Sequence, residues 1–240
     1  MLNRERQQGM KAPAQSTVEA PGNAAGQGGG RTPPPFTKGS HPANDVPRVG
    51  FLAPATASAW ANHLFEEDIA DVGYVTNSTR LWARMPHALD ALFDLMRQAA
   101  DAGHLTFRQR GILVTASAST LGDSYCSIAW GARLASVGGA VLSASVIRGV
   151  DEGLSPRERA LAQWARAVVV NPNATSAADV EGLRREGFHD DAIFAITTFV
   201  ALRLAFSTVN DALGIQPDQA LLDAVPSVIR DAAAFGRPET

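Results

Sequence analysis

Residues 105–131 read LTFRQRGILVTASASTLGDSYCSIAWG, and this stretch decides the fold class. Its first six residues share a pattern with residues 154–159, LSPRER, in which a hydroxyl residue is followed three positions later by Gln or Glu. This arrangement is a capping box, the sequence signature of a helix start, and Pro156 at the first helical position strengthens the second copy. We therefore expect two well-capped helices whose apolar runs are buried.

Apolar residues recur at helical spacing on both sides of this stretch. Two stripes run at i, i+3, i+4 and i+7, namely Leu89, Leu92, Phe93 and Met96 after Pro86, and Leu161, Trp164, Ala165 and Val168. The segment 192–206 is apolar on nearly every side, is interrupted by the charge of Arg203, and is too short to span a bilayer. We expect it to be the buried central helix. No strand alternation with hairpin turns persists, so the sequence predicts an all-α helical bundle.

The composition limits the classes of partner and site. The chain has 240 residues, of which 45% are hydrophobic, enough for one globular domain with a sizeable core. A net charge of −3 gives no basic surplus that suggests nucleic acid. The single cysteine, Cys126, excludes an internal disulfide framework and any zinc or iron–sulfur site built from cysteines. No His-x-x-x-His pair occurs, so we expect neither a metal nor a cofactor.

The first 46 residues differ from the rest. They are rich in Gly, Pro, Ala and polar residues, which have too little apolar surface to offset the entropy cost of ordering, so we expect a disordered tail. Residues 1–48 hold six basic and three acidic side chains, a net charge of +3, and a basic arm that contacts a partner is the alternative. The tail lacks an apolar signal region, so we expect a cytoplasmic protein without a membrane partner, with its helical domain at residues 47–236.

The chemistry of Cys126 depends on the turn before it. Gly122 is suited to end one helix and Asp123 to cap the next, which places Cys126 at the third position of that helix. The helix dipole favours the thiolate there, whereas the carboxylate of Asp123 disfavours a second negative charge. The two effects are of similar size. A reactive thiol and an inert core cysteine are therefore both open interpretations.

Other charged residues also carry two interpretations. Arg203, inside an apolar helix, needs an anionic or carbonyl partner, either a structural ion pair or a substrate carboxylate. His104 and His189 are expected to be solvated residues at helix ends. His63, beside the acidic run 66–68, is expected on an exposed face.

The layout resembles the alkylhydroperoxidase-D-like, carboxymuconolactone decarboxylase superfamily over about residues 47–222. The matching segments are residues 73–77, 85–89, 105–110, 122–130, 154–161, 183–188 and 211–214. The resemblance implies a helical bundle of that type, a homo-oligomer formed through its helices, and a small-molecule substrate.

The resemblance also implies a role for Cys126. Peroxidase members of the family use a Cys-x-x-Cys-x-x-x-His motif with a Glu roughly a dozen residues before it. Carried over, the peroxide-attacking cysteine is Cys126, while Asp123 holds the position of the resolving cysteine, Trp130 that of the histidine and Gly111 that of the glutamate. The resemblance therefore implies a peroxidase-related, antioxidant oxidoreductase with peroxiredoxin activity. Because only Cys126 of the motif is kept, the protein would not be a standard dithiol peroxidase, and turnover would need an outside thiol.

These considerations give one site hypothesis and two alternatives. Cys126 and Asp123 are the candidate catalytic residues, and Tyr125, Trp130 and Arg203 are candidates for the wall of a binding pocket. A dithiol-free lyase or decarboxylase with Asp123 as acid or base is one alternative. The other is a non-catalytic member of the family that binds a small molecule or a protein, because fold similarity does not select between them.

Overall fold

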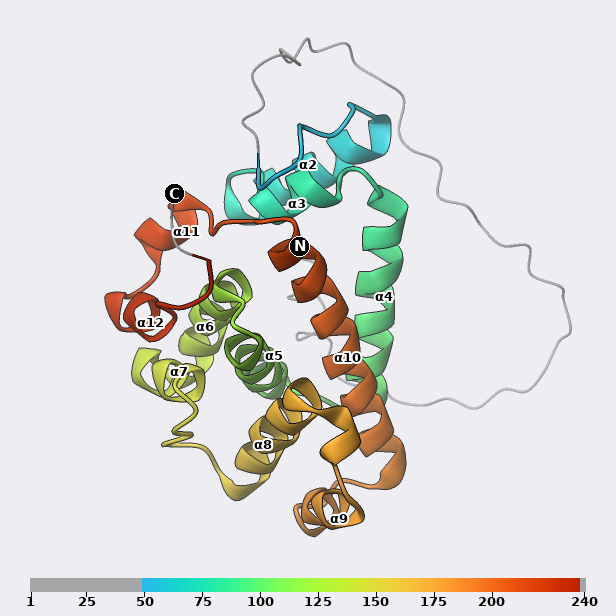
Figure 1. The fold of residues 1–240 in the computed structure, drawn as a ribbon, viewed down its shortest axis with the longest axis vertical. Coiled ribbons are helices and arrows are strands. Elements are labelled where there is room, and N and C mark those ends of the chain that lie inside the picture. The colour runs from blue at the N-terminus through green and yellow to red at the C-terminus, as the bar shows by residue number, and fades with distance from the viewer. Residues whose placement is uncertain (1–48, 238–240) are drawn as a thin grey trace, which may run out of the picture.

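The computed structural model describes residues 49–237, so the predicted tail and the start of the domain at Pro47 lie outside the described residues. Within residues 49–237 the secondary structure is helical and contains no strand (Figure 1). The elements in chain order are α2 (Ala59–Val72), α3 (Asn77–Trp82), α4 (Pro86–Ala102), α5 (Phe107–Leu121), α6 (Ser124–Gly138), α7 (Ala140–Ile147), α8 (Pro156–Val170), the short 3-10 helix η1 (Pro172–Ala174), α9 (Ala177–Arg185), α10 (Asp190–Ala212), α11 (Gln219–Ala224) and α12 (Ser227–Ala232). The predicted all-α class is confirmed.

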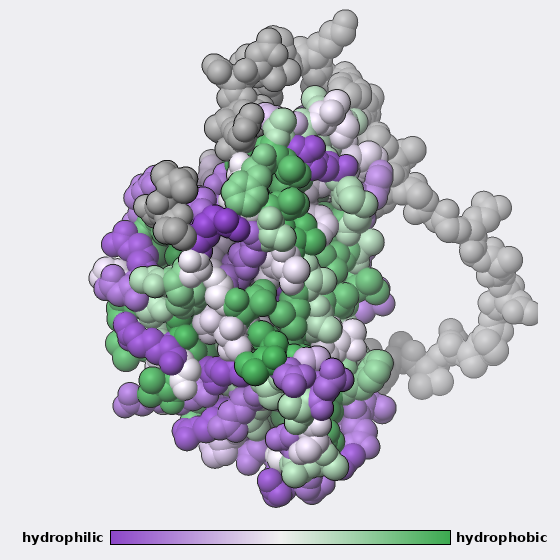
Figure 2. All heavy atoms as spheres, in the orientation of Figure 1, coloured by the Kyte–Doolittle hydropathy of each residue, from purple (hydrophilic) through white to green (hydrophobic). Residues whose placement is uncertain are grey.

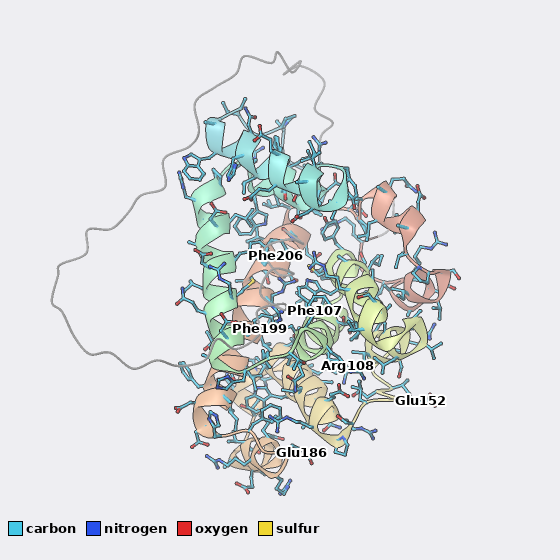
Figure 3. The ribbon with its side chains drawn as sticks, turned by 180° about the vertical axis from the view of Figure 1, so that it is seen from behind. Phe107, Arg108, Glu152, Glu186, Phe199 and Phe206 are labelled. Carbon is cyan, nitrogen blue, oxygen red and sulfur yellow. The ribbon has the colours of Figure 1, made fainter. Side chains whose placement is uncertain are left out.

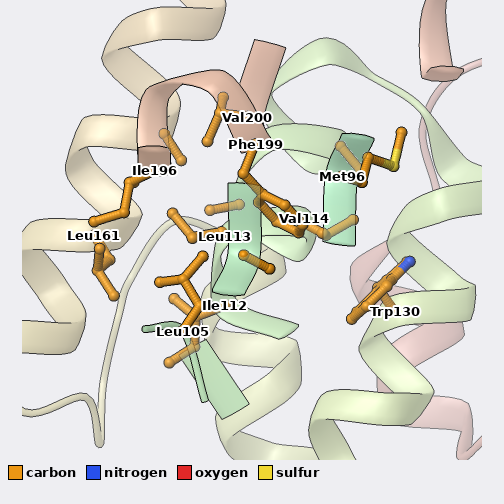
Figure 4. Packing of buried hydrophobic residues seen from close by; sticks show 14 of the residues in the cluster. Met96, Leu105, Ile112, Leu113, Val114, Trp130, Leu161, Ile196, Phe199 and Val200 are labelled. Carbon is orange, nitrogen blue, oxygen red and sulfur yellow. The ribbon is translucent and has the colours of Figure 1, made fainter. Parts of the chain in front are cut away.

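Helix α5 lies at the centre of the bundle, with α6, α7, α8 and α10 packed against it (Figure 1). Residues 110–118 of α5 are buried without interruption. Gly111 permits the approach of α6, since a Cβ there would lie 3.3 Å from the side chain of Leu134. Figure 4 shows Ile112 and Leu113 of this helix within the main cluster of buried side chains, with Trp130 of α6 at its edge.

Both predicted capping boxes are present. The Thr106 hydroxyl accepts from the Gln109 backbone N–H at 3.2 Å, and Gln109 Oε1 accepts from the Thr106 N–H at 2.9 Å. Ser155 and Glu158 make the same reciprocal pair at the start of α8. Arg108 Nε donates to Glu158 Oε1 at 2.6 Å, so the two helix starts are also joined to each other. The sequence repeat therefore marks neighbouring ends of two helices that pack together.

Helix α10 differs from its prediction in length and in position. The sequence indicated a helix over the apolar segment 192–206. The observed helix has 23 residues and is about 34 Å long at 1.5 Å per residue. Among the described residues, it is the one helix long and apolar enough to cross a membrane by length and composition, and half of its most apolar window is buried in the bundle. One side faces outward, where Phe194 is 76% exposed. The helix is therefore only partly buried, and α5, whose residues 110–118 are buried without interruption, is the central helix.

Apolar side chains also reach the surface along this part of the molecule. Figure 2 shows them along the middle of the viewed face, where α10 and α4 run in Figure 1, with hydrophilic residues gathered toward the lower and left margins. The predicted stripe of α4 points inward, since Leu89 and Met96 are buried and Leu92 and Phe93 pack on the core. All four residues of the predicted stripe of α8 are buried.

Helix α6 separates two groups of buried residues. One of its faces packs against α7 and α12, where Ile128 joins Ile147 and Ile229 in a second cluster. The approach is close at Gly131, where a Cβ would lie 3.0 Å from Ile229 and 3.1 Å from Ile147. The opposite side of α6 is turned toward α5 and α10. Cys126 and Trp130 lie on that side, in the main cluster.

Candidate functional site

A cavity with a volume of about 510 Å³ lies beside α6, within the range of about 300–1,000 Å³ that small-molecule pockets occupy. Four of the predicted residues, Tyr125, Cys126, Trp130 and Arg203, lie on its wall. Further wall residues come from the turn before α3, from α4 and from the segment before α11. Figure 3 shows Phe107 of α5 and Phe206 of α10, both wall residues, near the middle of the bundle.

The turn before Cys126 has the predicted geometry. Gly122 ends α5 in the left-handed region with φ of 88°, which a residue with a Cβ rarely adopts. Asp123 then caps α6, and its Oδ1 accepts from the Cys126 backbone N–H at 2.8 Å. Cys126 is the third residue of α6, as predicted from the sequence. The local sequence therefore fixes where the thiol enters the cavity wall.

The surroundings of Cys126 hold the thiol in its protonated form at neutral pH. Burial raises the pKa of Cys126 well above its usual range, and the Asp123 carboxylate raises it further. The Arg203 charge and the Ser207 hydroxyl lower the pKa but do not reverse the shift. The side chain is 3% exposed although it lies on the cavity wall. The helix dipole thus does not produce an acidic thiol here.

Asp123 lies behind the thiol rather than on the cavity wall. It is fully buried, and its Oδ2 has no hydrogen-bond partner among the described residues. Burial and the Asp123 charge together raise the pKa of Asp211 to about 7, while Arg237 lowers it. Asp123 therefore acts on its neighbours through charge. Its catalytic role stays a prediction, and such a role would reach a ligand only through Cys126.

Tyr125 links three parts of the cavity wall. Its hydroxyl donates to Asp218 Oδ2 at 2.7 Å and lies 3.3 Å from the Ser78 hydroxyl. Asp218 Oδ1 accepts from the Asn77 backbone N–H at 2.7 Å. Tyr74 is a second tyrosine on the cavity wall. Burial and the nearby Asp218 and Asp68 carboxylates raise the pKa of Tyr74 to about 12, so the Tyr74 hydroxyl stays neutral. Tyr125 is held in place by these bonds and contributes a fixed surface to the wall.

Arg203 and Trp130 form a stacked cationic and aromatic group. The Arg203 guanidinium lies 4.7 Å from the centre of the Trp130 ring and 5.8 Å from that of Phe206. Its Nη1 is 3.6 Å from Met96 Sδ. Contacts of this kind stabilise a buried cation. Arg203 lies on the cavity wall. The two roles left open by the sequence, a structural ion pair and the binding of a substrate carboxylate, both stay predictions.

Sequence reasoning missed two further arginines of the wall, Arg110 and Arg133. Each lies at helical spacing from a wall residue, since Arg133 follows Trp130 by three positions and Arg110 follows Phe107 by three. The guanidinium of Arg133 lies 4.6 Å from the Trp130 ring, and that of Arg110 lies 5.7 Å from the Phe107 ring. Projection of the sequence on a helical wheel would have found them.

The four histidines within residues 49–237 are not part of the cavity wall. His104 and His189 are exposed residues at helix ends, as predicted, and His189 Nδ1 accepts from the Ala192 N–H at the start of α10. His63 Nε2 is 3.3 Å from Glu67 Oε1 on α2. In residues 49–237 no group of three or more His, Cys, Asp or Glu side chains could hold a metal ion.

Comparison with known proteins identifies the fold. No protein-family model matches the sequence, and no curated protein matches it. The structure resembles the alkylhydroperoxidase AhpD core of an uncharacterized peroxidase-related protein from Ralstonia eutropha JMP134, with 20% identity, a TM-score of 0.64, and coverage of 73% of this chain and 96% of that one. A peroxidase-related protein from Silicibacter sp. TM1040 has 20% identity and a TM-score of 0.65, with coverage of 74% and 96%.

A third similar structure is the debrominase Bmp8, with 16% identity, a TM-score of 0.61, and coverage of 76% of this chain and 97% of that one. A cysteine-to-alanine variant of Bmp8 is known in complex with 2,3,4-tribromopyrrole. At these identities the likeness shows the fold, and the predicted bundle of the alkylhydroperoxidase-D-like type is confirmed. It leaves the reaction to be argued from the site.

Proposed function

We propose that this chain, which has the alkylhydroperoxidase-D-like fold, is a peroxidase-related oxidoreductase that works through the single thiol of Cys126. The observation that carries the proposal is the position of Cys126 on the wall of a cavity large enough for a small hydroperoxide. Two similar structures are peroxidase-related proteins, and a variant of a third was captured with a small ring compound. These likenesses support a small-molecule substrate.

The proposed reaction consumes one peroxide and two external thiols. The Cys126 thiolate attacks one peroxide oxygen, the O–O bond breaks, and the leaving alkoxide takes a proton to become an alcohol. The resulting sulfenic acid reacts with an external thiol, releasing water and forming a mixed disulfide. A second external thiol then releases the Cys126 thiol and leaves as a disulfide. No second cysteine exists in the 240-residue sequence, so an internal disulfide cannot form.

The raised pKa of Cys126 determines how this reaction depends on pH. The thiolate is the reacting form, and below the thiol pKa its fraction rises about tenfold for each pH unit. Burial and the Asp123 carboxylate keep that fraction small at pH 7. We therefore expect slow peroxide reduction at neutral pH and faster reduction as the pH rises. The positive charge of Arg203 favours the thiolate and moderates this effect.

Trapping of the sulfenic acid tests the proposal directly. The reduced full-length protein is mixed with cumene hydroperoxide and dimedone at pH 7, 8 and 9, and labelling of Cys126 is measured by mass spectrometry. We expect labelling that depends on peroxide and increases about tenfold per pH unit. The same protein should consume peroxide with dithiothreitol above the protein-free rate.

The matched control is Cys126→Ser, which removes the reacting sulfur and keeps a side chain of similar size. We expect this variant to consume peroxide at the protein-free rate. Absence of labelling at pH 9 in the wild-type protein, or equal consumption by the Ser variant, would contradict the peroxidase proposal.

A second candidate function is binding of a small molecule without thiol chemistry. The observation that favours it is the burial of Cys126 and the resulting rise in its pKa, which oppose attack on a peroxide. The dimedone experiment separates the two functions, since a binding protein would leave Cys126 unlabelled while the cavity still took a ligand.

Three further expectations belong to the proposal. We propose that the chain forms a homo-oligomer, and exposed Val137 and Val141 near the α6–α7 junction supply apolar surface for it. Light scattering would then report a mass well above the 25.3 kDa of one chain. We also propose an antioxidant role, which rests on the reaction above, and a cytoplasmic location.

A further inference from the structure

The cavity beside α6 combines apolar walls with an excess of cations. Aromatic rings of Phe93, Phe107, Trp130 and Phe206 face it, and so do three arginines, Arg110, Arg133 and Arg203. Two carboxylates, Asp68 and Asp218, also belong to the wall. Three of their four oxygens accept hydrogen bonds within the protein, since Asp68 Oδ2 accepts from the Thr76 N–H at 2.9 Å and Asp218 accepts from the Asn77 N–H and the Tyr125 hydroxyl.

Arg110 gives the most direct sign of an absent partner. The residue is only 9% exposed, and its Nε is buried without a hydrogen-bond partner among the described residues. A buried donor without an acceptor is destabilising, more so when the group is charged, so native proteins rarely leave one. The guanidinium lies over the Phe107 ring at 5.7 Å, which contributes no acceptor oxygen. A ligand oxygen in the cavity would supply it.

The three cations surround two neighbouring rings. The centres of Phe107 and Trp130 are 6.4 Å apart, and Arg133 and Arg203 lie 4.6 and 4.7 Å from the Trp130 ring. Helices α5, α6 and α10 each contribute to this group, so it is assembled only by the folded bundle. An apolar surface flanked by guanidinium groups is complementary to a flat ring that carries a carboxylate, because guanidinium binds carboxylate with two parallel hydrogen bonds.

We propose that this cavity binds a small planar organic carboxylate, with the carboxylate held by Arg110 and Arg203 and the ring packed against Phe107 and Trp130. The inference goes beyond the proposed function, because binding of a carboxylate in this cavity does not require peroxide reduction. In this proposal Arg110 and Arg203 recognise the negative charge of the ligand, and the rings of Phe107 and Trp130 recognise its flat shape. Arg133 adds positive potential beside the same ring.

Occupation of this site would also affect the thiol. Arg203 lowers the pKa of Cys126, and a bound carboxylate would offset that charge. The ligand would in addition fill space next to the sulfur, since Cys126 lies on the same wall. Bound carboxylate should therefore slow the alkylation of Cys126 in the wild-type protein. This readout reports binding in this cavity and not elsewhere on the surface.

The test compares two probes of the same shape, naphthalene-2-carboxylate and naphthalene-2-carboxamide. Titration calorimetry is performed on the full-length Cys126→Ser variant, so that binding is measured without thiol chemistry and its failure is distinct from that of the peroxidase proposal. We expect the carboxylate to bind at least about tenfold more tightly than the neutral amide. Equal affinity for the two probes, or no binding of the carboxylate, would overturn the inference.

Variants assign the effect to residues. Arg110→Gln and Arg203→Gln should each weaken carboxylate binding by about tenfold or more and leave amide binding within about twofold. Arg185→Gln, an exposed arginine on α9 away from the cavity, is the matched control and should bind both probes like the parent. Unchanged carboxylate affinity in both cavity variants would overturn the assignment. If a variant fails to fold, the comparison of the two probes on the parent still decides the outcome.

Discussion

Replacing Asp123 with asparagine is expected to speed the alkylation of Cys126 at pH 7 by roughly 3- to 30-fold. The carboxylate raises the pKa of the thiol, so its removal increases the thiolate fraction by about tenfold for each unit of pKa lost. A less basic thiolate is a weaker nucleophile, which cancels about half of the gain on a logarithmic scale. Asparagine keeps the oxygen that caps Cys126, so the start of α6 should persist. The rate of modification by iodoacetamide measures the change.

The neighbouring carboxylate supplies the matched control for this prediction. Asp211 senses the charge of Asp123, which helps to raise its pKa to about 7, but it is not among the groups that shift the pKa of Cys126. Asp211→Asn should therefore leave the alkylation rate within about twofold of wild type. An Asp123→Asn variant with an unchanged or slower rate would show that the carboxylate does not raise the pKa of the thiol.

Replacing Asp218 with alanine is expected to lower the free energy of unfolding by about 2–4 kcal/mol. Its two oxygens accept from the Asn77 backbone N–H and the Tyr125 hydroxyl, each at 2.7 Å, so the substitution leaves two donors without an acceptor. Burial raises the pKa of Asp218, and loss of this buried carboxylate offsets part of the cost. Urea unfolding of the full-length protein, followed by circular dichroism, gives the free energy.

Asp218→Asn separates hydrogen bonding from charge at the same position. The amide oxygen can accept from Asn77, and the hydroxyl of Tyr125 can rotate to accept from the amide nitrogen. We expect the free energy of unfolding to stay within about 1 kcal/mol of wild type. An alanine variant as stable as the asparagine variant would show that these links do not hold the cavity wall together.

Local sequence patterns predicted the parts of the site that depend on neighbouring residues. The capping pairs span three positions, and so does the contact from Asp123 to the Cys126 N–H. Gly122, whose backbone lies in the left-handed region, belongs to the two-residue turn between α5 and α6. Such features are decided within one or two turns of chain, where spacing and residue type determine the hydrogen bonds. The position of Cys126 in the first turn of a helix could therefore be predicted from the sequence alone.

The rest of the site depends on contacts between distant segments. Tyr125 meets Asp218 across 93 positions, and Asn77 meets it across 141, which no local pattern encodes. The sequence left the thiol pKa open because this pKa depends on burial, which the fold supplies. The length of α10 was underestimated for a related reason, since polar residues at both ends of the apolar segment continue the helix. Tertiary packing decides such questions.

The departure from the dithiol pattern has a physical consequence for the cavity. The resemblance places a resolving thiol at the position of Asp123, whose carboxylate raises the pKa of Cys126, and a histidine at the position of Trp130, whose ring centre lies 4.6 and 4.7 Å from two guanidinium groups. The first difference raises the thiol pKa, and the second supplies the aromatic surface on which the proposed planar ligand would pack. The raised pKa is the reason why we expect peroxide reduction to be slow at neutral pH.

The most direct test is the rate at which iodoacetamide alkylates Cys126 in the native full-length protein, measured from pH 6 to 11. It shows whether the cavity holds a sulfur that is accessible but protonated. Burial and the Asp123 carboxylate both raise the pKa of the thiol. We therefore expect alkylation without denaturant, with a midpoint above about pH 9. A midpoint below about pH 8, or a thiol that reacts only after unfolding, would contradict this expectation.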